Sequence, residues 1–384
     1  MEPRRQWRAT WDVMAVTEGF VPPPYPYDRL DAFKTLATRL DGGVVDLSIG
    51  TPCDPPPRSV VAALASSDTE RGYPASIGSA PLRDAFSRWM KRRFDVDVPS
   101  AQIAACVGSK EFVATLPQWL HLRSPRRDTV LYPAVSYPTY EMGATLAGCR
   151  AVAVSCDAAG RPLLETIAES DAERALVLWV NSPSNPTGAL DDLGAAAAWG
   201  RARGVPVVSD ECYAEFTWTG RPRSILQHGT EGVIALHSLS KRSNLAGLRV
   251  GAYAGDAELV SYLSEVRKHV GMMVPGPAQA AGAVALDDDV HVEEQKRLYL
   301  ERLSMMADVL SSWSDVEIPL PDGGFYLWFR VGDAWAYAER LAAVGGALVS
   351  PGEFYGPQSA EFVRVAVVQP TERLRLVASR LRES

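Results

Sequence analysis

A lysine lies among hydroxyl groups in the stretch IALHSLSKRSNLAGLRVG, residues 234–251. Lys241 follows Ser238 and Ser240 at the end of an apolar run, and Arg249 stands eight residues further on. A single lysine after a strand is more often a solvated loop residue than a reactive one. Beside two hydroxyls and an arginine it can instead react as a nucleophile next to an anion site.

Polar groups also follow other apolar runs of the chain. Asn185 lies in NSPSNPTG after ALVLWV, and Asp210 and Tyr213 lie in DECY after VPVVS. Taken singly, these residues are a turn former before proline, a helix cap and a core aromatic. Their occurrence in the order N-P-x-G, then D-x-x-Y, then S-x-S-K-x7-R favours a different interpretation, in which all of them bind one cofactor.

Pyridoxal phosphate needs this set of groups. Its aldehyde binds a lysine amine, and its pyridine nitrogen stays protonated beside a carboxylate. Its phenolic oxygen accepts hydrogen bonds from an amide and a tyrosine, and its ring packs on an aromatic face. Its phosphate binds an arginine, hydroxyls and free backbone N–H groups at a helix start. The motifs therefore predict a pyridoxal phosphate site.

The same motifs resemble those of the class I/II aminotransferases, the fold-type-I pyridoxal-phosphate enzymes, over most of the chain. The resemblance implies that Lys241 holds the aldehyde as a Schiff base and later carries the proton. It implies that Asp210 pairs with the pyridinium and that Asn185 and Tyr213 donate to the phenolic oxygen. The other implied cofactor contacts are ring stacking by Tyr137 and phosphate binding by Gly108, Ser109, Lys110, Ser238, Ser240 and Arg249.

The resemblance also implies how substrate and a second subunit bind. Gly50, in SIGTP, lines the substrate side, where Asn185 also contributes, and Arg364, in FVRVAVV, grips the substrate α-carboxylate. Tyr73, in GYPASIG, matches the tyrosine that reaches the phosphate of a neighbouring subunit, so a homodimer is expected. The partners are then small amino and keto acids.

At a finer level the motifs look like those of actinobacterial-type N-succinyldiaminopimelate aminotransferases of lysine biosynthesis. That implies ping-pong transfer between glutamate/2-oxoglutarate and N-succinyl-2-amino-6-oxopimelate. The alternatives are an aminotransferase of aromatic, aspartate or alanine type and a pyridoxal-phosphate lyase of the same fold. A non-catalytic regulator is disfavoured because no helix-turn-helix pattern precedes DLSIG. Candidates for the distal end of the substrate are Lys110, Arg242, Asn244 and Arg29.

The elements that must position these residues alternate between strands and helices. Apolar runs at 129–132, 175–180, 205–209, 233–236 and 250–255 predict buried strands, with helical patterns between them. Such alternation indicates a parallel sheet covered on both faces, with its ligand at the carboxyl ends of the strands. The expected fold class is α/β, with a mainly parallel seven-stranded sheet in a large domain at 45–275. A smaller α+β domain is expected from residues 1–44 and 276–384.

Composition narrows the remaining classes of function. The 384 residues carry a net charge of −7, which gives no reason to expect nucleic-acid or membrane binding. The five cysteines include no C-x-x-C pair, and the five histidines show no metal-ligand spacing. No apolar run has the length of a membrane span, and the first residues lack the pattern of a secretory signal. We therefore expect a cytoplasmic protein with reduced thiols and no metal.

Overall fold

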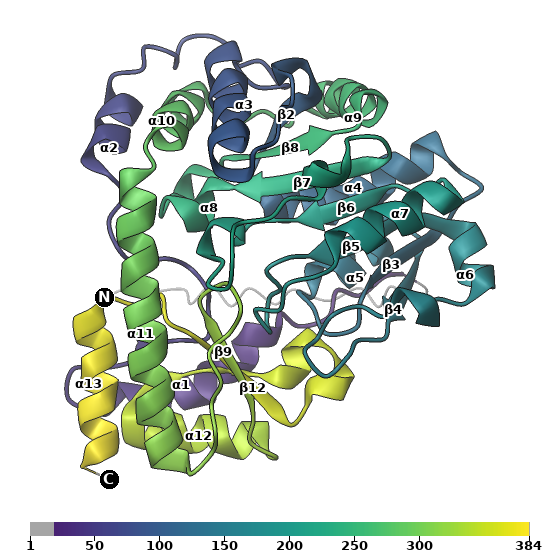
Figure 1. Ribbon diagram of the computed structural model, residues 1–384. Helices are drawn as coiled ribbons and strands as arrows, with labels where there is room; N and C mark the ends of the chain where they lie inside the picture. Colours follow the sequence, from purple (N-terminus) through teal and green to yellow (C-terminus); the bar gives the residue numbers. More distant parts are fainter. Residues whose placement is uncertain (1–18, 384) are drawn as a thin grey trace, which may run out of the picture.

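A seven-stranded sheet forms the centre of the larger part of the computed structural model, which describes residues 19–383 (Figure 1). Its strand order is β2-β8-β7-β6-β5-β3-β4. The bounds are β2 Ile103–Cys106, β3 Thr129–Pro133, β4 Arg150–Val154, β5 Ala175–Asn181, β6 Val207–Asp210, β7 Val233–Ser238 and β8 Gly251–Gly255. Only β8 runs against its neighbours. The predicted mainly parallel α/β sheet is confirmed.

Helices cover both faces of this sheet. Alternate strand residues enter two separate clusters, so that Leu178 of β5 packs on one face and Trp179 on the other. The first cluster takes in α3 (Ala80–Phe94), α7 (Leu193–Arg203) and α10 (Gly276–Asp287). The second takes in α4 (Ser109–Arg123), α5 (Thr139–Leu146) and α9 (Ala257–Val270). Burial on both faces explains why the strands are apolar throughout.

The C-terminal part packs helices on one small antiparallel sheet. The sheet has the order β11-β12-β9, from Ser350–Pro351, Phe362–Ala366 and Tyr326–Arg330. Its core also takes in α11 (Val290–Ser314), α12 (Ala334–Gly345) and α13 (Thr371–Arg382). A short parallel pair joins β1 (Val45–Asp46) to β10 (Ala347–Leu348). The observed α+β arrangement is the one that the sequence predicts for this part.

The hydrophobic clusters group some residues differently from the predicted domain bounds, and these bounds stay a prediction. The side chains of α10 pack with the sheet of the larger part, although the predicted large domain ends at residue 275. Val45 and Leu47 pack with the C-terminal core. Residues 1–18 of the predicted small domain lie outside the described residues.

The proline-rich arm lies on the C-terminal part. It leads through a 3₁₀ turn, η1 (Pro26–Leu30), into α1 (Asp31–Thr38), which packs on α12. The Tyr27 hydroxyl lies 3.1 Å from the Tyr355 hydroxyl, and Arg29 pairs with Glu353 at 2.6 Å. The arm therefore reaches the site described below from the C-terminal side.

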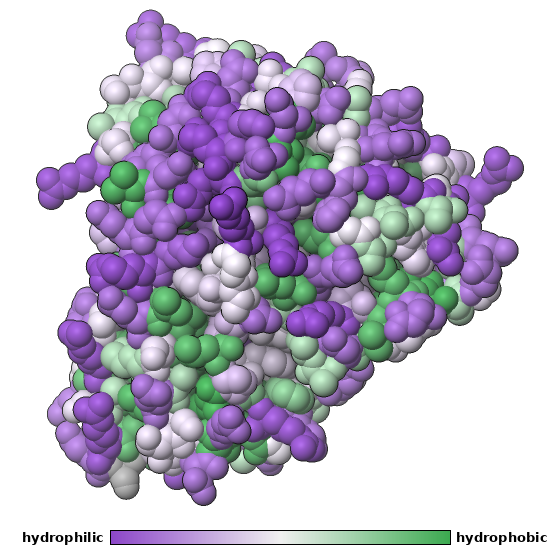
Figure 2. Space-filling view, viewed as in Figure 1, coloured by the Kyte–Doolittle hydropathy of each residue, from purple (hydrophilic) through white to green (hydrophobic). Residues whose placement is uncertain are grey.

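Polar and charged residues dominate the face seen in Figure 2, with apolar residues in smaller groups between them. Within residues 19–383, the helices are all too short or too polar to cross a lipid bilayer.

Candidate active site

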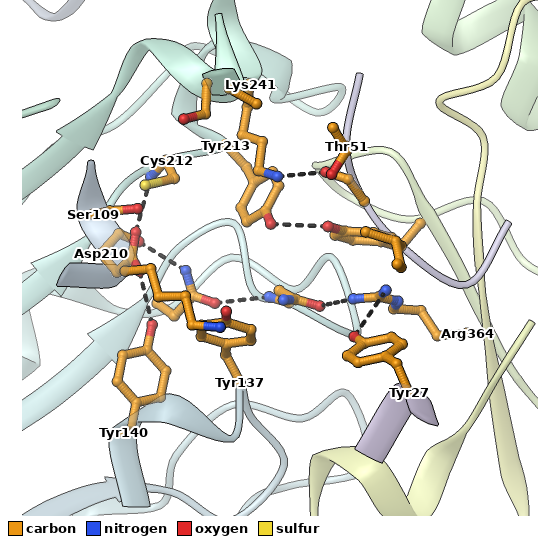
Figure 3. Close-up of a pocket in the computed structure, with 18 of the residues that line it drawn as sticks. Tyr27, Thr51, Ser109, Tyr137, Tyr140, Asp210, Cys212, Tyr213, Lys241 and Arg364 are labelled. Atoms are coloured by element: carbon orange, nitrogen blue, oxygen red, sulfur yellow. Dashed lines mark hydrogen bonds between the residues drawn. The ribbon is translucent and has the colours of Figure 1, made fainter. Parts of the chain in front are cut away.

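The carboxyl ends of the central parallel strands bring polar residues to one edge of the sheet. Asn181 ends β5, Asp210 ends β6 and Ser238 ends β7, and Asn181 pairs in register with Asp210. A cavity of about 410 Å³ lies at this edge, closed on the far side by residues of β9 and β12 (Figure 3). Of the predicted residues, its lining includes Gly50, Ser109, Lys110, Tyr137, Asn185, Asp210, Tyr213, Ser240, Lys241, Arg249 and Arg364.

Lys241 points into this cavity from a single helical turn, α8 (Leu239–Arg242). Ser238 caps the turn by accepting a hydrogen bond from the Ser240 N–H at 3.1 Å. The Lys241 ammonium donates to the carbonyl of Gly50. Burial lowers the pKa of Lys241 to about 8, and the cations Arg364 and Arg249 act in the same direction. The amine is therefore partly neutral near physiological pH.

We expect acylation of Lys241 in the cofactor-free chain to rise with pH and to reach half its maximum near pH 8, because only the neutral amine reacts. Peptide mapping after a brief pulse of acetic anhydride at a series of pH values measures this. Lys91 serves as the control, since its hydrogen bond to Asp95 raises its pKa. Parallel pH profiles for the two lysines would contradict the assigned environment.

Asp210 is a buried carboxylate whose described donors are neutral. Oδ2 accepts from the Tyr140 hydroxyl at 3.0 Å, and Oδ1 accepts from the Cys212 N–H at 3.2 Å. Burial raises the pKa of Asp210. A protonated pyridine nitrogen would supply the missing cation, so this carboxylate fits the ring nitrogen of pyridoxal phosphate.

An arginine, a glycine and the start of α4 form a cradle for an anion. Arg249 has φ 56°, and its guanidinium donates to the carbonyls of Ala246 at 2.8 Å and Val107 at 3.3 Å. Gly108, with φ 75°, precedes α4, and a Cβ at this position would overlap the Arg249 guanidinium. The Ser240 hydroxyl accepts a hydrogen bond from Ser238 at 2.9 Å. Free helix N–H groups beside a guanidinium whose described partners are neutral carbonyls fit a phosphate.

Arg364 is a buried cation, 1% exposed, whose described acceptors are all neutral. It donates to the Asn185 side-chain oxygen at 2.7 Å and to the carbonyl of Ser48. Its guanidinium lies 4.2 Å from the Tyr326 ring centroid and 4.8 Å from that of Tyr355. Its Nε has no hydrogen-bond partner among the described residues. A ligand carboxylate would satisfy this uncompensated charge.

Lys110 lies where the arm meets the larger part. It comes from the first turn of α4, and its ammonium donates to the Tyr25 hydroxyl at 3.3 Å. It also lies 6.0 Å from the centroid of the Tyr137 ring, which lines the same cavity. Its described hydrogen-bond partner is a phenol, so its charge is available to a ligand.

Three of the predicted distal-end candidates lie outside the cavity lining. Arg242 is buried and pairs with Glu215 at 3.2 Å and with Asp289 at 3.1 Å. Asn244 donates to Gln295 at 2.9 Å, and Arg29 pairs with Glu353. Arg242 follows Lys241 in the chain, but the helical turn directs it away from the cavity, which sequence adjacency does not reveal. Their contact with substrate stays a prediction, and the partners described here for all three are protein groups.

Three other predicted residues, Gly108, Ser238 and Tyr73, also lie off the lining, and Gly108 borders the Arg249 guanidinium. Ser238 reaches the cavity through the Ser240 hydroxyl. Tyr73, on the segment between α2 (Arg58–Ala65) and α3, is fully exposed and lies away from the cavity of its own chain.

Loss of the buried ion pairs of Arg242 should lower the stability of the fold and leave the affinity for substrate unchanged. We expect Arg242→Met to lower the free energy of unfolding by about 3–5 kcal/mol, since it leaves Glu215 and Asp289 with fewer partners. Arg88→Met is the matched control, since its pair with Asp287 is half exposed and should contribute about 0–1 kcal/mol. Urea unfolding at neutral pH measures both. Unchanged stability with a raised KM would restore Arg242 as a substrate contact.

The sequence analysis assigns no role in the site to several lining residues. Tyr25, Tyr27, Thr51, Tyr140, Asn181, Cys212 and Tyr326 all line the cavity. Asn181 and Tyr140 follow predicted strands, which is a usable signal. Tyr326 opens a strand far along the chain, and only the packing of β9 against the larger part brings it to the cavity.

The fold and this cavity define a pyridoxal-phosphate-dependent transferase of fold type I. The family model for aminotransferase class I and II matches residues 42–381. The chain belongs to this family, whose members use pyridoxal phosphate.

Relatives with different substrates resemble the chain over nearly its whole length. It is 39% identical to 4-dedimethylamino-4-oxo-anhydrotetracycline transaminase OxyQ of Streptomyces rimosus, over 94% of this chain and 99% of that one. It is 35% identical to the LL-diaminopimelate aminotransferase of Aquifex aeolicus, over 94% and 96%. A solved structure of a probable N-succinyldiaminopimelate aminotransferase from Thermus thermophilus matches with a TM-score of 0.83 and 32% identity, over 94% of this chain and 100% of that one.

Proposed function

We propose that this aminotransferase moves an amino group between glutamate and N-succinyl-2-amino-6-oxopimelate. The observation that carries the proposal is the charge of the cavity. Four basic side chains line it, Lys110, Lys241, Arg249 and Arg364, whereas Asp210 is the one acidic side chain in the described lining. The cofactor takes up Lys241 and Arg249, and the α-carboxylate takes up Arg364. This leaves Lys110 to favour a further negative group on the substrate.

Succinylation changes the charge of diaminopimelate in the direction that this cavity favours. Free diaminopimelate carries two carboxylates and two ammonium groups, so its net charge is near zero. The succinyl group replaces one ammonium by a neutral amide and adds a carboxylate. Arg364 then binds the α-carboxylate, and Lys110, from the opposite part of the chain, binds a distal carboxylate. The similarity to the Thermus thermophilus structure supports the same substrate.

The chain's own residues supply positioning and proton transfer. Pyridoxal phosphate, when bound, supplies an electron sink for the amino acid Cα–H bond as it loses its proton. Arg364 orients the substrate through its α-carboxylate, and the neutral Lys241 amine takes the proton from Cα. Asp210 keeps the ring nitrogen protonated, and Tyr213 and Asn185 donate to the phenolic oxygen. Tyr137 packs on the ring, and Gly50 leaves space beside it.

A panel of amino donors tests the substrate assignment. With 2-oxoglutarate as acceptor, we expect kcat/KM to be highest for N-succinyl-LL-diaminopimelate. N-acetyl-LL-diaminopimelate, LL-diaminopimelate, aspartate, alanine and phenylalanine complete the panel. A higher value for LL-diaminopimelate would favour the activity that names the Aquifex aeolicus relative. Release of pyruvate and ammonia, without amino transfer, would indicate a lyase.

A Lys110 variant separates the distal contact from the chemistry. We expect Lys110→Met to raise KM for the succinylated substrate by roughly 10–100-fold, the cost of one charge-assisted hydrogen bond of about 1.5–3 kcal/mol. The KM of alanine, which has no second carboxylate, should stay within about twofold. An equal change for both substrates would show that Lys110 acts on the cofactor or the fold instead.

We also propose a homodimer in which Tyr73 reaches the phosphate site of the partner subunit. Two observations support this proposal. The side chain of Tyr73 is fully exposed. In the described structure, the hydrogen-bond partners of Arg249 are backbone carbonyls and include no tyrosine of the same chain. Light scattering gives the mass in solution. In mixed dimers, a Tyr73→Phe subunit should weaken cofactor binding only in the other subunit.

A further inference from the structure

Tyr326 lies where the substrate side and the cofactor side of the cavity meet. It begins β9, and its register partner on β12 is Ala366. Arg364 pairs with Trp328, two residues along β9, so Arg364 and Tyr326 are diagonal neighbours on one face of the small sheet. The strand register therefore places the Arg364 guanidinium beside the Tyr326 ring. The guanidinium carbon lies 4.2 Å from the centroid of that ring.

The hydroxyl of Tyr326 faces the other way, toward the cofactor side. It lies 2.9 Å from the Tyr213 hydroxyl, and both residues are buried. A Cβ on residue 50 would overlap this hydroxyl, so Gly50 is needed for the close approach. One side chain thus contacts the arginine proposed for the substrate, the tyrosine proposed for the cofactor and the glycine beside them.

A hydroxyl can donate one hydrogen bond and accept others, which gives this pair a direction. If Tyr213 donates to the phenolic oxygen of the cofactor, its own oxygen must act as acceptor toward Tyr326. Donation by Tyr326 then polarises the Tyr213 hydroxyl and strengthens its bond to the cofactor. We propose that Tyr326 is a positioning residue with two separable effects: its hydroxyl orients the Tyr213 proton toward the cofactor, and its ring holds Arg364 for the substrate carboxylate.

Tyr355 provides a matched comparison. Its ring lies against the same guanidinium, 4.8 Å from the centroid, but its hydroxyl bonds to Tyr27 instead of Tyr213. A variant of Tyr355 therefore removes a ring from Arg364 without touching the Tyr213 hydroxyl.

The test uses the cofactor-loaded enzyme and two measurements other than turnover. One is the midpoint of the pH-dependent colour change of the cofactor bound to Lys241. The other is the Kd of glutarate, a dicarboxylate that cannot react. We expect Tyr326→Phe to raise the midpoint by about 0.3–1 pH unit, because a weaker bond from Tyr213 leaves more negative charge on the phenolic oxygen. Its glutarate Kd should stay within about twofold, because the ring remains.

The leucine variants should separate the two effects. Tyr326→Leu should raise the midpoint and weaken glutarate binding by roughly 2–30-fold, the range expected for a lost cation–π contact. Tyr355→Leu should weaken glutarate binding alone. An unchanged midpoint in Tyr326→Phe, or an equal midpoint shift in Tyr355→Leu, would overturn the proposal. Circular dichroism verifies the fold of both leucine variants. If either variant does not fold, Tyr326→Phe still tests the effect of the hydroxyl, because it keeps the ring.

The inference rests on the proposed cofactor contact of Tyr213, so Tyr213→Phe serves as a further control. It should raise the midpoint more than Tyr326→Phe does, and adding Tyr326→Phe to it should cause no further shift. No shift in Tyr213→Phe would refute the proposed contact of Tyr213 itself. If Tyr213→Phe shifted the midpoint and the double variant showed the sum of the two single shifts, the contact of Tyr213 with the cofactor would stand. Only its coupling to Tyr326 would then be refuted.

Discussion

Lys241→Ala is expected to lower kcat by at least about 10⁴-fold, because the variant loses both the covalent anchor and the proton carrier. The hydrogen-bond partner of the buried amine in the described structure is a backbone group, the Gly50 carbonyl, so no acidic side chain pairs with it there. Single-turnover assays with glutamate and saturating cofactor measure the loss.

The fold should survive this replacement. Burial holds the folded-state pKa of Lys241 near 8, below the usual value for lysine, so folding near pH 7 must bury a group that remains largely protonated. For such a lysine, stability is lowest below the folded-state pKa of about 8 and rises as pH increases from there toward the usual lysine value of 10.5. Lys241→Ala should therefore keep or raise the melting temperature of the cofactor-free chain at pH 7. Lys91→Ala, on the surface, is the control for both measurements. Wild-type turnover in pure Lys241→Ala would refute the assignment.

Asp210→Asn is expected to lower kcat by roughly 10²–10⁴-fold at saturating cofactor. The variant keeps the shape of the side chain but removes its charge, and loss of one partner from a buried ion pair costs about 3–5 kcal/mol. Rates are compared over a range of cofactor concentrations, and cofactor affinity is measured separately by fluorescence.

The shape of the cofactor dependence decides the role of Asp210. If excess cofactor restored the full rate, Asp210 would hold the cofactor without keeping its ring nitrogen protonated. Asp287→Asn, which weakens an exposed pair with Arg88, should leave both the rate and the affinity near wild type.

The parallel part of the fold was predictable because its strands are apolar on both faces. The runs at 129–132, 175–180 and 233–236 all lie within observed strands. Two strands were missed for local reasons. β2 (IAAC) is short and rich in alanine, and β4 (RAVAV) is an edge strand that is partly exposed, so neither shows a strong apolar pattern.

The sequence by itself determined which chemical groups this chain offers and in what order. Lys241, Asp210, Asn185 and Arg249 follow strands or lie in motifs, and parallel strands bring their carboxyl ends to one edge whatever the details of packing. The cavity lining includes all four. For these residues, strand order and local spacing were sufficient.

Only the tertiary structure decided which neighbouring residues face the cavity. Arg242, next to Lys241, turns into a buried ion pair, whereas Lys110 reaches the cavity beside the arm residue Tyr25. Tyr326 joins Arg364 to Tyr213 through contacts between residues 113 and 38 positions apart in the chain. Side-chain direction depends on helix rotation, strand register and the docking of the two cores, and local sequence spacing specifies none of these long-range contacts.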